Sequence, residues 1–364
     1  MKIKDISTQL EAYAPRALQE SYDNVGLLVG NQEDEVDSAL ISLDVTEEVL
    51  EEAKQQGCGL IIAHHPLIFG GLKRLNGNNP VERMVIKAIR DKIAIYAIHT
   101  NLDNTINGVN AILGKKLGLR DMRILQPQEG ALSKLVTFCP SAQADVVRNA
   151  LFNAGGGNIG NYDSCSYNLE GYGTFRGNED ASPFVGEKGK LHKENETRIE
   201  VIFPTFMRSR LLQALKESHP YEEVAFDIYP LANVFELAGA GMIGNLPEAA
   251  DEKEFLQMLK KTLGTGVIRH SALLGKAIKT VAFCGGSGAF LIDRAKSAGA
   301  DIFITGDAKY HQFFEADGKM IIADAGHYET EQFTKELLYT VLNEKFPTFA
   351  LRISQSNTNA VHYF

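Results

Sequence analysis

The chain has no tryptophan, only four cysteines and no long apolar run. Its cysteines are scattered, so the sequence predicts neither a disulfide framework nor a thiolate metal site of CxxC type. No stretch approaches the ~18 apolar residues that a membrane helix requires. The first residues, MKIKDISTQLEAY, contain no apolar core of a signal peptide. We therefore expect a cytoplasmic protein with no membrane partner.

An excess of positive charge is also missing. The 46 acidic residues outnumber the 37 Lys and Arg, which gives a net charge of −9. Such a chain has no general attraction to nucleic acid phosphates, so binding to duplex nucleic acid is not expected. The hydrophobic content of 44% is that of an ordinary globular protein. A length of 364 residues exceeds the size at which one core stops growing, which predicts two domains.

One short apolar run ends in two consecutive histidines. The run LIIA at 60–63 is too short for a helix and is typical of a strand buried in a parallel sheet. His64 and His65 follow it, at the carboxyl end where open α/β sheets bind their ligands. Neighbouring side chains of a strand point to opposite faces, so both imidazoles reach one site only if the chain turns there, which Pro66 favours. Alternatively, one is a core histidine and the other a surface residue.

Two later strings repeat this pattern of an apolar strand with a polar end. The string KIAIYAIHTNLD predicts a strand followed by His99 and Asp103. The string MIIADAGHYETEQF predicts a strand that leads into a helix carrying His327 and Glu331. These two residues are four apart, so they lie on one helical face about one turn from each other. Three strand ends that finish in His or carboxylate predict a metal site.

Four strings together resemble a known family. They are YDNVGLLVG, AHHPLIFGGL, IHTNLD and GHYETEQF, and they are similar to the NIF-three-like family, whose members are labelled GTP cyclohydrolase 1 type 2 homologues. The resemblance runs from the N-terminus to about Lys335. It implies a metal centre and a toroidal homohexamer, in which the chain's partner is itself. The residues that match the family's metal ligands are His64, His65, Asp103, His327 and Glu331.

The implied ligands suggest the number and kind of ions. Imidazole and carboxylate without thiolate suit zinc, iron, manganese or cobalt. Three His and two carboxylates are too many for one open catalytic ion, and they predict two divalent ions about 3.5–4 Å apart. Asp103 or Glu331 is expected to bridge the ions, because a carboxylate has two oxygens whereas an imidazole has one available nitrogen.

The order of predicted elements divides the chain. Residues 1–126 alternate strand and helix, which predicts an α/β domain with a mainly parallel sheet. Residues 127–234 follow the order β-α-β-β-α-β of ferredoxin-like α+β domains, and their strings GNYDSCSYNLEGYGTFRG and HPYEEVAFDIYP resemble the CutA-like insert of longer family members. The first pattern returns in residues 235–364. If Asp103 and His327 bind one centre, the middle segment is an insert that splits one discontinuous domain.

A glycine-rich turn is a candidate substrate-binding element. The residues Gly285, Gly286, Ser287 and Gly288 follow a predicted strand and precede a helix. In this layout backbone N–H groups can bind an anion such as a substrate phosphate. Close packing alone also explains these glycines.

Several further polar residues are candidates for roles beside the metal. Asp307 and His311 are predicted to share a helical face, either as a rival metal pair or near the site in a substrate or proton-transfer role. His99 and His311 are candidate proton carriers, because imidazole exchanges protons near pH 7. Asp44 ends a strand, where it either hydrogen-bonds a ligand histidine or closes a turn.

Two functions of different classes follow. The first is a dinuclear metal-dependent hydrolase whose ions lower the pKa of a water toward neutrality, acting on a nucleotide or related phosphorylated small molecule as the family label suggests. The second is a non-enzymatic assembly or regulatory protein that the ions stabilise and whose insert binds a ligand or partner. Catalytic ions keep an open coordination position, and five protein ligands for two ions leave such positions, which favours the enzyme.

Overall fold

The computed structural model describes all residues 1–364, which form two compact units. One consists of residues 1–127 and 236–364, and the other of residues 128–235. The four cysteines are unpaired, and Cys58, Cys139 and Cys284 are buried. Among the helices, none combines the length and the apolar character that crossing a membrane requires.

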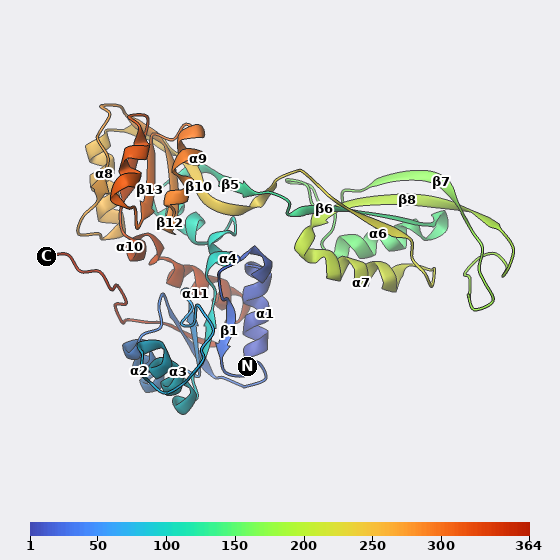
Figure 1. Cartoon of the computed structure of the whole chain (residues 1–364), viewed down its shortest axis with the longest axis horizontal. Helices are drawn as coiled ribbons and strands as arrows, with labels where there is room; N and C mark the ends of the chain where they lie inside the picture. Colours follow the sequence, from blue (N-terminus) through green and yellow to red (C-terminus); the bar gives the residue numbers. More distant parts are fainter. The chain divides into compact units, whose positions relative to one another are not determined.

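The first sheet of the discontinuous unit has five strands. Across the sheet these are β1 (Gly26–Val29), β4 (Ala94–Ala97), β3 (Leu60–Ala63), β2 (Ser38–Ser42) and β15 (Ala350–Ile353). All neighbouring pairs are parallel except β1 with β4. The three central strands are buried along their whole length, because helices cover both faces of the sheet (Figure 1). These helices are α1 (Ile3–Tyr13) and α11 (Thr334–Lys345) on one face, and α2 (Glu47–Gln55) and α3 (Pro80–Asp91) on the other.

The second sheet of this unit has six strands. They are β11 (Arg269–His270), β14 (Ile321–Asp324), β13 (Ile302–Gly306), β12 (Ile278–Ser287), β10 (Phe235–Ala250) and β5 (Arg120–Gln128). The central strands β12, β13 and β14 are parallel, with β10 and β11 antiparallel beside them. The expected single, mainly parallel sheet is therefore corrected to two sheets. The strands β10 to β14 pair with one another and with β5, and only β15 of the later strands joins β2, β3 and β4.

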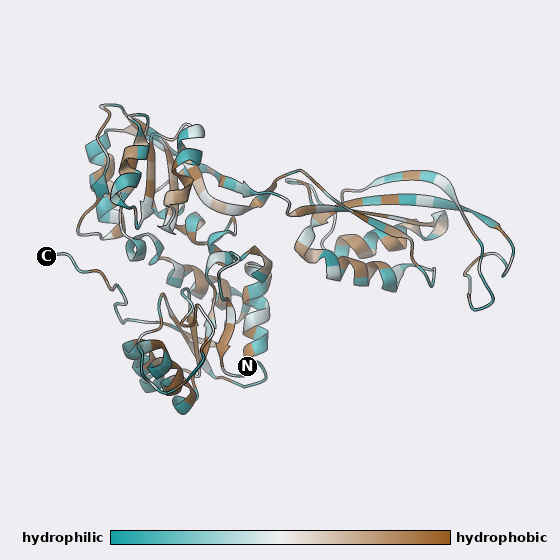
Figure 2. Cartoon of the chain, in the orientation of Figure 1, coloured by the Kyte–Doolittle hydropathy of each residue, from teal (hydrophilic) through white to brown (hydrophobic).

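Helices also cover both faces of the six-stranded sheet. Apolar side chains of α5 (Val109–Lys116) and α8 (Glu252–Leu263) pack on one face, and those of α9 (Ile292–Ser297) pack on the other. Brown, apolar residues run along the central strands of both sheets, whereas the helices alternate brown and teal (Figure 2). This is the pattern of helices that bury one face only.

The unit of residues 128–235 has the element order β-α-β-β-α-β that the sequence predicts. Its antiparallel sheet has the order β7 (Tyr167–Phe175), β8 (His192–Pro204), β6 (Leu132–Pro140), β9 (Phe226–Pro230). The helices α6 (Ala144–Asn153) and α7 (Arg208–Ser218) lie side by side on one face of it (Figure 1). Their contact with the sheet buries a separate apolar core, which includes Leu151, Val201 and Leu211.

Capping residues determine where the helices that follow two of the parallel strands begin. Thr46 caps α2, and its hydroxyl accepts the Val49 N–H at 3.2 Å. Asn79 caps α3 in the same way, with Pro80 as the first helical residue. Since β2, β3 and β4 run in one direction, their carboxyl ends meet at a single edge of the five-stranded sheet. The candidate site lies at this edge.

Candidate metal centre

His64 and His65 both reach the same cluster although they are neighbours in the chain. The strand β3 ends at Ala63, and the backbone N–H groups of His64 and His65 bond to the carbonyls of Ser42 and Leu43. The chain then turns at Pro66, so the two imidazole centroids lie 4.9 Å apart. The turn that the sequence predicts thus brings both side chains to one side.

Asp103 and His99 arrive from the neighbouring strand. After β4 the chain forms the one-turn helix α4 (Thr100–Asp103), which His99 precedes as its N-cap residue. The imidazole of His99 lies 5.2 Å from that of His64 and 5.3 Å from that of His65, measured between ring centroids. A carboxylate and a third imidazole therefore join the pair from β3.

His327 and Glu331 come from the second sheet. The strand β14 ends at Asp324, and the short helix α10 (His327–Glu331) begins after Gly326, whose φ of +97° favours glycine. The Nε2 atom of His327 lies 3.1 Å from Oε2 of Glu331, as expected for residues four apart on one helical face. Glu329, on the same helix, belongs to none of the groups that could hold an ion, and it accepts a hydrogen bond from Asn359.

The five side chains converge on a small volume. Oε2 of Glu331 lies 3.0 Å from Nε2 of His65 and 3.8 Å from Nε2 of His64. Nε2 of His64 lies 3.5 Å from Oδ1 of Asp103, and the Nε2 atoms of His65 and His327 are 3.3 Å apart. Groups of three within this cluster are arranged so that they could hold a metal ion.

Each imidazole of the cluster is oriented through its Nδ1 atom. The Nδ1–H of His64 donates to the carbonyl of Ile98 at 2.8 Å, and that of His65 donates to Asp44 Oδ1 at 2.7 Å. The Nδ1–H of His99 donates to Asp23 Oδ1 at 2.8 Å, and that of His327 donates to Asp307 Oδ2 at 2.7 Å. This leaves each Nε2 atom free to act as an acceptor or a ligand. The contact of Asp44 with His65 is the hydrogen bond that the sequence offered as one of two roles for this carboxylate.

Burial and charge shift the protonation of the cluster. Burial lowers the pKa of His64 to about 4, so this imidazole is neutral at pH 7. Burial also disfavours charged His65 and His327, but their carboxylate partners outweigh it and raise the pKa to about 10 for His65 and about 9 for His327. Burial would raise the pKa of Glu331, but the three surrounding imidazoles lower it. Burial and the charge of Glu331 raise the pKa of Asp103.

The glycine turn makes room for Glu331. A Cβ atom at Gly286 would lie 2.1 Å from Oε1 of Glu331, and the φ of this residue is +62°. The backbone N–H groups of Gly285, Gly286 and Gly288 already donate to Asn110, Thr330 and Thr305 at 2.9, 3.0 and 2.8 Å. The predicted anion cradle is therefore corrected: close packing explains these three glycines, and only Ser287 of the turn is exposed.

The structure does not bring His311 to the cluster. Residues 307–309 are not helical, and the 3-10 helix η5 begins at Tyr310, so Asp307 and His311 do not share a helical face. The imidazole of His311 is exposed and stacks on Phe314. Asp307, in contrast, contacts His327 directly. The expected pairing of these residues is thus replaced by one between Asp307 and a histidine 20 positions later.

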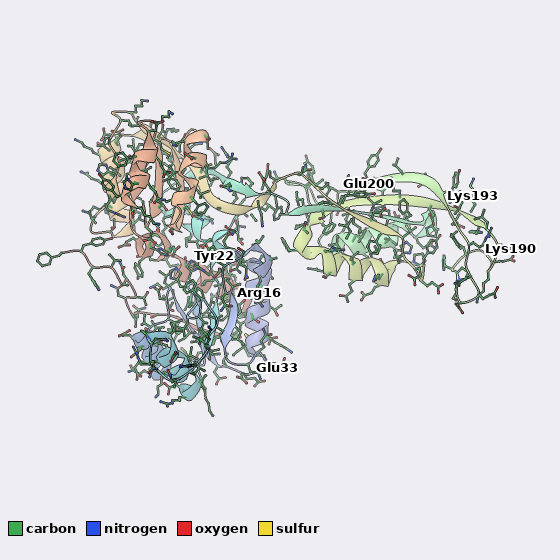
Figure 3. All side chains as sticks on the ribbon, viewed as in Figure 1. Arg16, Tyr22, Glu33, Lys190, Lys193 and Glu200 are labelled. Atoms are coloured by element: carbon green, nitrogen blue, oxygen red, sulfur yellow. The ribbon has the colours of Figure 1, made fainter.

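A cavity of about 1000 Å³ opens on the cluster. Four members of the cluster, His65, Asp103, His327 and Glu331, line it together with His99. Tyr22, labelled in Figure 3, belongs to the segment between the 3-10 helix η1 (Arg16–Leu18) and β1. It is one of the residues that line the cavity. The cluster is thus accessible to a small molecule.

Sequence reasoning missed two features that shape the site. Asp23 is buried and also accepts hydrogen bonds from the N–H and hydroxyl of Thr100, and its only sequence signal is its place in the string YDNVG. The C-terminal residues 358–361 and 363 line the cavity, and the Thr358 hydroxyl donates to Asp44 at 2.6 Å. No local pattern in this polar tail indicates such contacts.

Comparisons with known proteins cover the whole chain. The profile of the family described as Duf34/NIF3 (NGG1p interacting factor 3) matches residues 1–360. The chain is 40% identical to a GTP cyclohydrolase 1 type 2 homolog from Halalkalibacterium halodurans over 95% of both chains. It is 37% identical to the protein of that name from Bacillus subtilis, over 96% of this chain and 95% of the other. The crystal structure of a Bacillus cereus protein related to NIF3 aligns with a TM-score of 0.87 at 37% identity, covering 100% of this chain and 99% of that one.

Proposed function

We propose, given that the chain belongs to the Duf34/NIF3 family, that it is a metal-dependent hydrolase of a small molecule. Its ligands would be the five converging side chains His64, His65, Asp103, His327 and Glu331. The name of the relatives makes GTP the first substrate to test.

Three buried atoms without a partner carry this proposal. Nε2 of His64, Oδ1 of Asp103 and Oε2 of Glu331 are buried, and none of them has a hydrogen-bond partner outside the cluster. A buried polar atom without a partner costs about 1–3 kcal/mol, so three of them pointing at one another need a compensating group. Ligand atoms about 2.1 Å from one ion lie roughly 3.0–3.4 Å apart, close to the 3.0–3.5 Å spacings of most neighbours in this cluster. The residues present therefore fit a divalent ion.

The arrangement favours two ions rather than one. One group of three consists of His64, Asp103 and Glu331, and another of His65, His327 and Glu331. Glu331 is common to both, so it is the better candidate for the bridging carboxylate of the two that the sequence left open. Nitrogen and oxygen ligands suit zinc, iron, manganese or cobalt.

The side chains around the cluster have distinct tasks in this proposal. Bound ions would supply Lewis acidity and lower the pKa of a water toward neutrality. Asp44 and Asp307 orient His65 and His327 through their Nδ1 atoms, which fixes the direction of each Nε2. The Asp23 carboxylate orients His99 through its Nδ1 atom, and His99, which lines the cavity, is the candidate proton carrier. The cavity holds the substrate beside these groups.

Metal content and turnover test the proposal. Elemental analysis should find about two ions per chain in the natural protein, and none in the variant with His64→Ala and His327→Ala. Turnover of GTP and of a panel of nucleotides, phosphoesters and uncharged heterocycles is then compared with that of Asp103→Ala. If the natural protein consumes no member faster than this variant, the regulatory alternative replaces the hydrolase.

We also propose that residues 128–235 are an inserted CutA-like domain and that the chain forms a toroidal homohexamer. The split βαβ topology of this unit and its separate core support the first proposal. Replacing the unit by a short linker should leave a folded protein that still binds metal, and loss of both would contradict this. A light-scattering mass near that of the 40.0 kDa chain would contradict the hexamer.

A further inference from the structure

Exposed aromatic rings gather around the cavity. Tyr22, Phe69, Phe290 and Tyr363 line it, and each exposes between 48% and 69% of its surface. Aromatic rings are usually buried, so four that stay open around one cavity form a surface on which a flat ligand can stack. Phe69 also packs edge to face on His99, with ring centroids 5.9 Å apart, which places this surface directly beside the cluster.

The charges of the cavity disfavour an anionic ligand. Its lining includes no lysine and a single arginine, Arg269. That guanidinium forms an ion pair with Asp324 and donates to the carbonyl of Ala308 at 3.0 Å. Seven carboxylates line the same cavity: Glu20, Asp44, Asp103, Asp307, Asp324, Glu329 and Glu331. With two divalent ions bound and the coordinating imidazoles uncharged, these seven carboxylates still outnumber the positive charges by two, which is seven less one for the guanidinium and four for the ions.

Three backbone donors beside the cavity that could bind a phosphate are also engaged. Backbone N–H groups of the glycine turn bond within the protein, as described above. Phosphate sites instead combine cationic side chains with free backbone N–H groups.

We infer that the ligand of this cavity is an uncharged planar heterocycle, stacked on the aromatic rings beside the metal cluster, and that a nucleoside triphosphate is not its substrate. The inference rests on the proposed function for the reaction that follows binding, but the binding itself can be measured without turnover. The inference therefore excludes GTP, the nucleotide in the relatives' name, as the ligand of this cavity.

A series with constant base and increasing charge tests the inference. Guanosine, GMP, GDP and GTP are titrated into the full-length protein by calorimetry, both metal-loaded and metal-free, beside a panel of neutral purines, pteridines and pyrimidines. We expect GTP to bind at least about tenfold more weakly than guanosine at low salt, with a smaller difference at high salt, because charge repulsion is screened. Tighter binding of GTP than of guanosine, or no neutral heterocycle with a Kd below about 1 mM, would overturn the inference.

Two phenylalanines provide a matched pair of variants. Phe290 lines the cavity and is 67% exposed, whereas Phe314 lies outside it on η5 and is 68% exposed. A stacked ring contributes to affinity, so Phe290→Ala should weaken binding of the best neutral heterocycle at least about tenfold without changing metal content. Phe314→Ala should leave its affinity unchanged. Equal effects of the two variants would exclude stacking in the cavity.

A charge change and a turnover assay complete the test. Glu20→Lys puts a cation at the cavity and should strengthen GTP binding while leaving guanosine unaffected, and no change for GTP would contradict the argument from charge. Heterocycle binding without any turnover would leave this inference intact and remove the hydrolase. Turnover of GTP, together with tighter binding of GTP than of guanosine, would support the hydrolase and contradict this inference.

Discussion

Gly286→Ala is the sharpest test of how the fold positions Glu331. The added Cβ would lie 2.1 Å from Oε1 of Glu331 and 3.2 Å from Nε2 of His327, at a residue whose φ is +62°. An ordinary contact begins at 3.4 Å, so the carboxylate oxygen must move by about 1.3 Å, which is 3.4 less 2.1. Glu331 belongs to two of the three groups of possible ligands, so its displacement would disturb both of these groups.

The size of the effect has two parts. Placing a Cβ in the left-handed region costs about 1–2 kcal/mol of folding stability. Loss of a hydrogen-bond partner of a metal ligand already lowers metal affinity about 10–100-fold. Displacing a ligand oxygen by more than 1 Å disturbs the metal site more than such a loss does. We therefore expect Gly286→Ala to lose at least about 100-fold in metal affinity in addition to its lower stability.

A second glycine separates these parts. Gly264 has a φ of +64° and no atom within 4 Å of an added Cβ, so Gly264→Ala carries the same backbone cost without a clash. Chemical denaturation measures the free energy of unfolding of both metal-free variants, and competition with a chelator measures their metal affinity. Only Gly286→Ala should lose metal. If it kept two ions per chain at unchanged affinity, the proposed position of Glu331 in the centre would be wrong.

Three further predictions follow from the same contacts. The pKa values raised to about 10 for His65 and about 9 for His327 mean that both are protonated at pH 7 without metal. Metal affinity should therefore rise with pH from 6 to 9, and calorimetry in two buffers should show about two protons released per chain on metal binding. Release of less than one proton would contradict the protonated pair. Asp307→Asn should reduce metal affinity about 10–100-fold with little change in Tm, because it weakens the hydrogen bond that orients His327, and unchanged affinity in a chelator titration would exclude this role. Thr358→Val removes the donor to Asp44 and should lower the free energy of unfolding by about 1 kcal/mol in urea, whereas an unchanged midpoint would show that the tail does not contribute.

The chain's own sequence indicated part of the site because strand ends are a local property. Four buried apolar residues followed by His64 and His65 define the end of β3, and the next apolar strand ends near Asp103 in the same way. Parallel neighbours must bring such ends to one edge, so the pattern alone predicts their meeting. The spacing of His327 and Glu331 likewise follows from one turn of helix. Membership of the family, which the same strings suggested, rests on the profile match over residues 1–360.

Only the tertiary structure decided what surrounds these side chains. The hydrogen-bond partners of the imidazoles are far away in sequence, 76 positions between Asp23 and His99, and the tail contact between Thr358 and Asp44 spans 314 positions. Such pairs depend on which strands lie side by side in the sheet, β1 beside β4 and β15 beside β2, which the pattern of one segment does not contain. The glycine turn shows the same limit: its sequence suits an anion cradle as well as close packing, and the approach of Glu331 from another helix decides for packing.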